Sequence, residues 1–258
     1  MTTMTSFGSV DELRRRLRAM RADGPGAKVR SDGSPARWTA APGERVVLVC
    51  GCGGSTGATT VALALATVSG PARVVEACGG TASGLAYAAS AELGSTERGW
   101  LQGTRDGVVI ERRIDPVASL DHLPTPAHTD LPLTIVDSSW DVSAVLASSS
   151  WLGDLARSAP TVVLVARATV PGLRRMEAAL ELVGESRAFA VTVGTKRWPR
   201  AVEQSAGMAV RRLGARGRIV DVPEVPALAI SGLTPDPLPP AVTRAAYALL
   251  NLLEGPLS

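Results

Sequence analysis

Short apolar runs recur along the chain and alternate with stretches of helical periodicity. The runs are rich in Val, Leu and Ala, which is typical of strands buried on both faces. They predict strands at residues 46–50, 72–77, 108–114, 133–136, 161–166, 189–193 and 218–222. The run at 108–114 starts apolar and then alternates with charged residues, so we expect it at an edge of the sheet.

Apolar residues at helical spacing separate most of these runs. They predict helices at about 59–69, 83–93, after Asp141, from Pro171 to about Val183, from Pro199 to about Leu213 and at about 241–254. This alternation predicts an α/β fold, a three-layer, mostly parallel sheet with helices on both faces. Ligands of such sheets bind beyond the carboxyl ends of the strands.

A short N-terminal helix and a flexible linker are expected before this domain. Ser9 and Glu12 form a capping-box pattern, followed by a thin apolar stripe and five arginines. Residues 22–44 are rich in Gly, Pro and Ser. We therefore divide the chain into residues 1–44 and 45–258. The basic helix can contact DNA, a membrane surface or a partner protein, or it can pack on its own domain.

Composition tells more about the cellular compartment of the protein than about its function. The 258 residues suffice for one large domain, and the net charge of +3 does not argue for nucleic acid. Cys50, Cys52 and Cys78 match no zinc pattern and are odd in number, which favours a reducing compartment. No apolar run reaches about 18 residues and no secretory signal is visible, so we expect a cytoplasmic protein.

The strand at 46–50 leads into a glycine-rich loop and then a helix, which is the layout of a phosphate cradle. In the pattern G-x-x-x-x-G-K-[ST], Cys52 and Gly57 take the glycine positions and Thr59 the Mg²⁺-binding hydroxyl. Ala58 stands where the lysine belongs. The residues predicted to bind nucleotide are Gly51, Cys52, Gly53, Gly54, Ser55, Thr56, Gly57, Ala58, Thr59 and Thr60.

Two acidic residues follow predicted strands and complete a candidate metal site with Thr59. Asp137 ends the strand at 133–136, as a Walker B aspartate does, and Glu76 lies at the end of the strand at 72–77. Glu76 can orient the water around Mg²⁺, or it can be a solvated strand end.

Other interpretations of the loop remain open at this point. A glycine-rich turn for a dinucleotide is one, although G-x-G-x-x-G is absent. A Cys52 thiol with a lowered pKa at the helix start is another, against an inert, partly buried thiol.

The order of these motifs resembles the ParA/MinD family of P-loop ATPases over residues 45–254, closest to its CpaE- and TadZ-like branch. Residues 52–60 are similar to the family's K-G-G-x-G-K-T-T with one extra residue, and residues 133–137 to its Walker B strand. The resemblance implies a P-loop NTPase-like fold, ATP or ADP with Mg²⁺, a homodimer and a protein partner in a larger apparatus.

The chain departs from the family at both loop lysines, where Cys52 and Ala58 stand. CpaE-like proteins also have alanine at the second position. Loss of that lysine removes a charge-assisted phosphate contact and a source of transition-state stabilisation. Lys196, Arg167 and Arg73 are candidate replacements within the chain, and an arginine from a second subunit is another.

Three functions follow. The leading one is a nucleotide-binding positioning or assembly factor for partition, localisation, secretion or conjugation, with weak or no ATP hydrolysis. The second is a slow Mg²⁺-dependent ATPase with a replacement cation. The third is a nucleotide-free scaffold that acts through the N-terminal helix.

Overall fold

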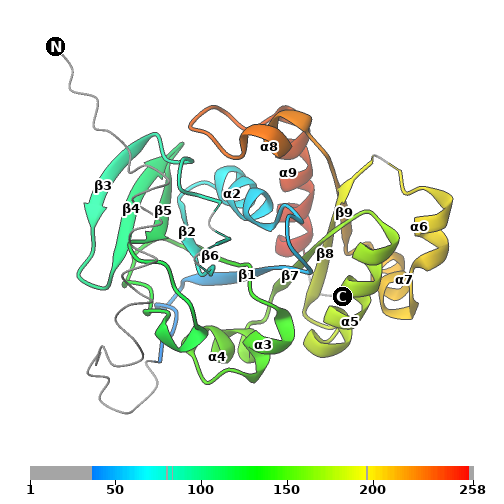
Figure 1. Cartoon of the computed structure of the whole chain (residues 1–258), viewed down its shortest axis with the longest axis horizontal. Coiled ribbons are helices and arrows are strands. Elements are labelled where there is room, and N and C mark those ends of the chain that lie inside the picture. Colours follow the sequence, from blue (N-terminus) through cyan, green and yellow to red (C-terminus); the bar gives the residue numbers. More distant parts are fainter. Residues whose placement is uncertain (1–36, 80, 83, 196, 256–258) are drawn as a thin grey trace. The chain divides into compact units, whose positions relative to one another are not determined.

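The structure is a computed structural model that describes residues 37–79, 81–82, 84–195 and 197–255. The predicted N-terminal helix lies outside these residues. Within them, nine strands form one sheet in the order β3-β4-β5-β2-β6-β1-β7-β8-β9 (Figure 1). The strands are β1 (Arg45–Gly51), β2 (Ala72–Glu76), β3 (Ala91–Ser95), β4 (Trp100–Arg105), β5 (Val108–Arg113), β6 (Leu133–Ser138), β7 (Val162–Arg167), β8 (Ala188–Gly194) and β9 (Ile219–Pro223).

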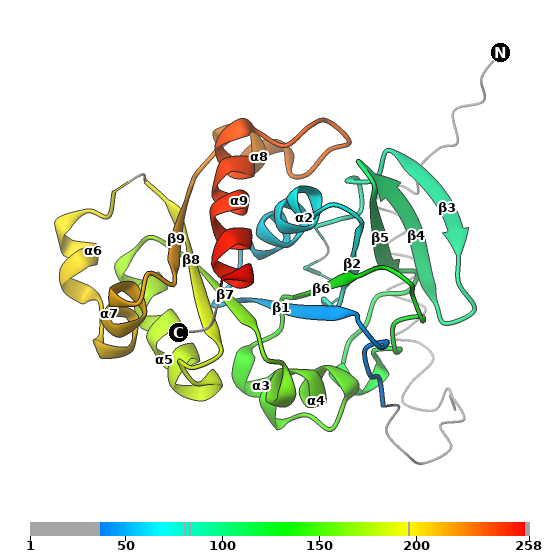
Figure 2. The ribbon, with the colours of Figure 1, turned by 180° about the vertical axis from the view of Figure 1, so that it is seen from behind.

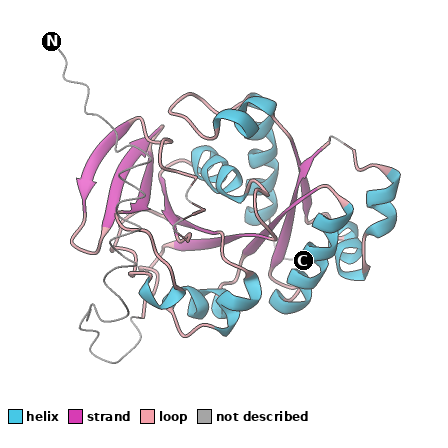
Figure 3. Ribbon diagram, viewed as in Figure 1, coloured by secondary structure: helices cyan, strands magenta, loops and turns pink. Residues whose placement is uncertain are grey.

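From β5 to β9 along this spatial order, every pair of neighbouring strands is parallel. Only β4 is antiparallel to both of its neighbours, β3 and β5. Helices cover both faces of this sheet (Figures 2 and 3). On one face lie α2 (Ala58–Ser69), α8 (Pro226–Ser231) and α9 (Pro240–Glu254). On the other lie α3 (Val142–Ala147), α4 (Trp151–Ser158), α5 (Val170–Val183), α6 (Arg200–Ser205) and α7 (Met208–Ala215). The predicted three-layer α/β fold is confirmed.

Burial on both faces explains the continuous apolar runs. In β1, Val47 and Val49 pack with α2 and α9, whereas Leu48 and Cys50 pack with the helices of the opposite face. A strand in this position needs apolar side chains in both phases of its period of two. The strands at the centre of the sheet were predictable for this reason.

The predicted helix at 83–93 is wrong in its described part. Residues 84–90 are irregular with a turn at 86–88, and residues 91–95 form β3. Leu85 and Ala88 are buried in the core, and the Glu76 carboxylate accepts hydrogen bonds from the Gly84 and Leu85 amides. Tertiary contacts therefore override a weak helical pattern.

The predicted edge position of residues 108–114 is also wrong. The strand there, β5, lies between β2 and β4, because the β3–β4 pair extends the sheet beyond it. Two charged residues of β5 are buried and ion-paired: Glu111 with the buried Arg73, and Arg112 with Glu92, whose side chain is itself exposed. A strand in which apolar and charged residues alternate lies at the edge of a sheet only when its charged side chains remain in contact with water.

The single helix predicted from Pro199 to Leu213 is divided at Gly207 into α6 and α7. The carboxylate of Glu177, from α5, accepts hydrogen bonds from the Ala209 and Val210 amides and so caps the start of α7. A Cβ at Gly207 would collide with that carboxylate. The region after Asp141 is likewise two helices, α3 and α4, and a turn-rich segment contains the short helix α8.

Residues 37–44 pack on the domain, although the sequence placed them in the linker. The Trp38 ring lies edge-on to the Trp151 ring, with centroids 5.5 Å apart. Glu44 pairs with Arg73 at 3.1 Å, and both side chains are almost completely buried. Arg73 also pairs with Glu111 at 3.4 Å and donates from Nε to the Thr134 hydroxyl at 2.7 Å. This network joins the segment before β1 to β2, β5 and β6.

None of the helices within the described ranges has the length and apolar character needed to cross a membrane.

Replacing Arg73 by alanine should destabilise the domain strongly. The change leaves the Glu44 and Glu111 carboxylates buried without their cation, which typically costs about 3–5 kcal/mol. Urea unfolding at pH 7 measures this loss. Arg45→Ala is the matched control, because Arg45 pairs with Glu254 at the surface and such pairs contribute about 0–1 kcal/mol. Equal losses in the two variants would contradict the buried network.

Candidate functional site

The glycine-rich loop begins where β1 ends, at the centre of the sheet. β1 pairs with β6 on one side and with β7 on the other. The chain builds the sheet outward from β1 in both directions, with β7, β8 and β9 on one side and the remaining strands on the other. The Cys52 amide continues the pairing by donating to the Val165 carbonyl at 2.8 Å. The loop therefore emerges at the topological switch point, where doubly wound sheets bind their ligands.

The loop backbone turns tightly, and its outermost residues are exposed to solvent. Gly57 has φ 87° immediately before α2, and Ser55 has φ 55°, a region rare for residues with a Cβ. Residues 53–55 are exposed, whereas Thr56 is buried beneath them. A Cβ at Gly51 would lie 2.8 Å from the Thr56 hydroxyl oxygen, so only glycine fits there without displacing Thr56.

The start of α2 is open to an anion. No side chain among the described residues caps this twelve-residue helix, and its first turn contains no acidic residue. The amides of a helix N-terminus have no intrahelical partners and carry partial positive charge. Thr59 and Thr60 are half-buried there, and the Ala58 methyl is buried. Ala58 supplies neither charge nor reach toward a phosphate, so the positive potential here comes from the backbone.

Thr59 and Asp137, two of the three predicted metal ligands, lie together. The Thr59 hydroxyl lies near enough to the Asp137 carboxylate to lower its pKa, and this carboxylate is completely buried. Burial, the largest cause, and the neighbouring Glu76 charge together raise the pKa of Asp137 to about 7, against the lowering effect of Thr59 and Cys78. One carboxylate oxygen, Oδ1, has no hydrogen-bond partner among the described residues. A hydroxyl beside a buried carboxylate with a spare oxygen fits Mg²⁺.

Glu76, the third predicted metal ligand, is engaged with backbone amides. Its side chain is buried beside Asp137, so it is not a solvated strand end. Its Oε1 accepts hydrogen bonds from the Gly84 and Leu85 amides, both at 3.0 Å. Gly84 in turn lies against Thr59, where a Cβ would come within 2.9 Å of Cγ2. Glu76 thus holds the segment that follows β2 over the Thr59 side chain.

Within the described ranges, no group of three or more His, Cys, Asp or Glu side chains is arranged to hold a metal ion by itself. A Mg²⁺ held by Thr59 and Asp137 would take its remaining oxygens from water and phosphate, which is usual for nucleotide sites.

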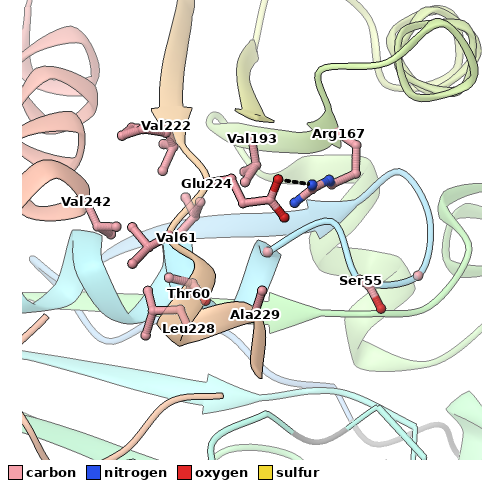
Figure 4. A pocket seen from close by; sticks show the side chains of 14 residues that line it. Ser55, Thr60, Val61, Arg167, Val193, Val222, Glu224, Leu228, Ala229 and Val242 are labelled. Atoms are coloured by element: carbon pink, nitrogen blue, oxygen red, sulfur yellow. Dashed lines mark ion pairs between the residues drawn. The ribbon is translucent and has the colours of Figure 1, made fainter. Parts of the chain in front are cut away.

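A pocket of about 510 Å³ lies beside the loop on the α8 and α9 side (Figure 4). The loop supplies one wall and the ends of β7, β8 and β9 supply another. Its lining residues are Gly54, Ser55, Gly57, Thr60, Val61, Arg167, Val193, Val222, Pro223, Glu224, Val225, Leu228, Ala229 and Val242. Sequence reasoning missed the contribution of residues 222–229, although the end of the strand before Pro223 was a signal.

A second cavity, also of about 510 Å³, lies on the opposite side of the loop, against α3 and α5. Arg175 of α5 lines it, and its Nη1 lies 2.9 Å from the position that a Cβ of Gly53 would take. This guanidinium was not predicted to reach the loop. The chain therefore offers a cavity on each side of residues 51–57.

The three residues predicted as replacements for the lysine differ in their positions in the structure. Arg73 is bound in the buried network with Glu44 and Glu111, so it is excluded from the loop. Lys196 lies outside the described residues. Arg167 lies in the pocket beside the loop.

Cys50, Cys52 and Cys78 are free and buried. Burial raises the pKa of Cys52 to about 12 and raises the pKa values of the other two thiols as well. The hypothesis of a reactive, low-pKa Cys52 is therefore wrong, because desolvation outweighs the nearby helix N-terminus.

Replacing Asp137 by asparagine should stabilise the metal-free domain increasingly between pH 4 and pH 7. In this range the folded carboxyl keeps its proton, whereas the unfolded one, with its ordinary pKa of 3.8, loses it. Wild-type stability then falls by up to about 1.4 kcal/mol per pH unit through this group. Asparagine does not titrate and escapes this loss. Urea unfolding with EDTA from pH 4 to 8 measures the difference.

Asp141→Asn is the control of opposite sign. Hydrogen bonds from Ser143 and Ala144 lower the pKa of Asp141, so its stabilisation is present at neutral pH and is lost as the pH falls. Parallel curves for Asp137→Asn and wild type would contradict a raised pKa at Asp137.

No protein-family model matches the sequence, and comparison with curated protein sequences gives no significant match. Comparison with solved structures does. MinD from Pyrococcus horikoshii OT3, complexed with Mg-ADP, is 14% identical with a TM-score of 0.50, over 82% of this chain and 96% of that one. A plasmid partition protein from Borrelia burgdorferi B31, bound to AMPPNP, is 11% identical with a TM-score of 0.52, over 82% and 99%.

Apo McdA from Cyanthece is 12% identical with a TM-score of 0.52, over 81% of this chain and 99% of that one. At such identities the similarity concerns the fold, which spans nearly the whole of each of these proteins. The chain has the α/β P-loop fold found in MinD and in plasmid partition proteins.

Proposed function

We propose that this protein binds ATP or ADP with Mg²⁺ at residues 51–60 and uses the nucleotide as a conformational or dimerisation switch, with weak or no hydrolysis. In this proposal it is a positioning or assembly factor that works with a protein partner in a larger apparatus. The observation that carries it is the uncapped start of α2, which opens directly onto the 510 Å³ pocket.

The phosphates belong at the start of α2 in this proposal. Loop amides and the helix N-terminus would hold them, as in other phosphate cradles. Thr59 and Asp137 would hold the Mg²⁺, which neutralises phosphate charge when it is bound. Glu76 would act through the segment it holds over Thr59, because its carboxylate is engaged with the Gly84 and Leu85 amides.

The base and sugar belong in the pocket beside the loop. Its far wall is apolar, with Val193, Val222 and Leu228, and its volume lies in the range of small-molecule sites. The structural neighbours support nucleotide binding on this fold, since P. horikoshii MinD is complexed with Mg-ADP and the Borrelia partition protein is bound to AMPPNP.

Weak hydrolysis follows from Ala58. A lysine at that position contacts the phosphates from which charge leaves in the transition state, and removing such a contact costs much of the rate. The same substitution supports placement in the CpaE- and TadZ-like branch, whose members it resembles. Nucleotide binding survives such a loss more easily, because the backbone amides remain.

The cavity on the α5 side of the loop is the surface that we assign to the second subunit of a homodimer or to the partner protein. It combines the Arg175 guanidinium with the exposed Leu182 side chain, and it reaches the loop at Gly53. A partner bound there would touch the nucleotide-binding loop directly. Nucleotide binding and partner binding would then influence each other.

Calorimetric titration with ATP and ADP, with and without Mg²⁺, tests the nucleotide site. Ala229→Trp should weaken binding at least about tenfold, because the indole fills the pocket that Ala229 lines. Ala227→Trp is the matched control, since Ala227 lies on the same exposed helix and does not line the pocket. Thr59→Ala should remove the gain in affinity that Mg²⁺ provides.

The other two functions are distinguishable outcomes of the same series. Steady Mg²⁺-dependent phosphate release that is lost in Asp137→Ala would establish a slow ATPase. Absence of heat and of thermal shift at millimolar nucleotide would overturn the proposal and favour a scaffold that needs no nucleotide. In that case deletion of residues 1–22 should abolish partner recruitment, and changes in the loop should have little effect.

A further inference from the structure

One ion pair crosses the pocket beside the loop. Arg167, the last residue of β7, and Glu224, the residue after β9, approach to 2.6 Å between Nη2 and Oε2 (Figure 4). Their side chains are 34% and 42% exposed. Partly solvated pairs of this kind are held weakly, so either group can exchange its partner at little cost.

The main chain on both sides of the pair is fixed. The Ala168 amide donates to the Val193 carbonyl at 2.9 Å, and the Glu224 amide donates to the Gly194 carbonyl at 2.8 Å. A Cβ at Gly172 would collide with the Arg167 carbonyl, so α5 packs closely against that residue. The two side chains therefore start from rigid positions, and only their ends can change partners.

The charges in the pocket are unusual for a site that borders the phosphate-binding start of α2. Of the described residues that line it, Arg167 is the single cation and Glu224 the single carboxylate. The start of α2 attracts anions, whereas the Glu224 carboxylate repels them. Ala58 contributes no charge to offset that repulsion. The net preference of the pocket for an anion thus depends on which group the Arg167 guanidinium faces.

We propose that Arg167 is the phosphate-binding cation of this pocket, and that Glu224 occupies it until a nucleoside di- or triphosphate arrives. This inference rests on the nucleotide site proposed above. Guanidinium binds phosphate through paired hydrogen bonds, and a multiply charged phosphate chain competes well against one carboxylate. Arg167 exchanges Glu224 for phosphate oxygens, and the exchange breaks the link between the segments that follow β7 and β9.

The exchange makes a prediction that a merely structural ion pair does not. Removing either member of a structural pair would lower stability and leave ligand affinity alone. Here the two substitutions change affinity in opposite directions, because one removes the cation and the other removes its competitor. Adenosine, which has no phosphate, should be insensitive to both substitutions.

Titration calorimetry of the full chain with Mg-ADP and with adenosine tests this. Arg167→Gln should weaken ADP binding about tenfold, the loss of one charge-assisted contact. Glu224→Gln should strengthen it severalfold, and raising the salt concentration should weaken ADP binding to wild type more than to Arg167→Gln. Arg157→Gln is the matched control, because Arg157 forms a partly exposed pair with Asp154 in α4.

The outcomes separate this inference from the proposed function. If wild type binds ADP and both substitutions leave its affinity within twofold, the exchange is wrong and the nucleotide site stands. If Glu224→Gln weakens binding as Arg167→Gln does, Glu224 contacts the nucleotide and does not compete with it, which also overturns the exchange. If neither wild type nor Glu224→Gln binds ADP, the proposed function fails, and this inference with it.

Discussion

The whole site depends on the position of β1, a strand that is hydrogen-bonded on both sides and buried on both faces. Its end cannot move without disturbing β6, β7 and two hydrophobic cores. The chain leaves this rigid strand through a loop with a left-handed Gly57 and enters α2 at once. The amides at the start of α2 are therefore aimed at one fixed point beyond the sheet, and the ends of β6, β7, β8 and β9 lie around that point.

Electrostatics at this point is a balance between buried acids and backbone amides. Asp137 and Glu76 lie at paired positions of neighbouring strands, and both are buried. Their mutual repulsion and desolvation would be costly alone. Glu76 is compensated by two amides, and Asp137 by the Cys78 thiol, while the nearby Thr59 lowers the pKa of Asp137. One oxygen of Asp137 still lacks a partner among the described residues, which leaves a place for a cation.

Because the lysine is absent, other elements must bring side-chain positive charge to the loop. In a complete P-loop one side chain of the helix start carries positive charge to the phosphates. Here Ala58 is neutral, and guanidinium groups approach from neighbouring elements, Arg167 from the end of β7 and Arg175 from α5. A cation on a separate element can pair with a carboxylate of the same chain, as Arg167 does with Glu224. In the proposed exchange, phosphate affinity depends on this pairing as well as on the loop.

The sequence by itself determined the central strands, the loop and the carboxylate of Asp137, because double-sided burial and glycine-rich turns leave local signals. It did not determine the β3–β4 extension, the break at Gly207 or the engagement of Glu76, since these depend on contacts between residues distant in sequence. The same holds for the cations. Arg73 stands at the start of one apolar run and Arg167 at the end of another, yet only the tertiary structure buries the first with Glu44 and brings the second to the pocket. The sequence pattern does not reveal which group a charged side chain pairs with, so only the folded chain decides which arginine can contact a phosphate.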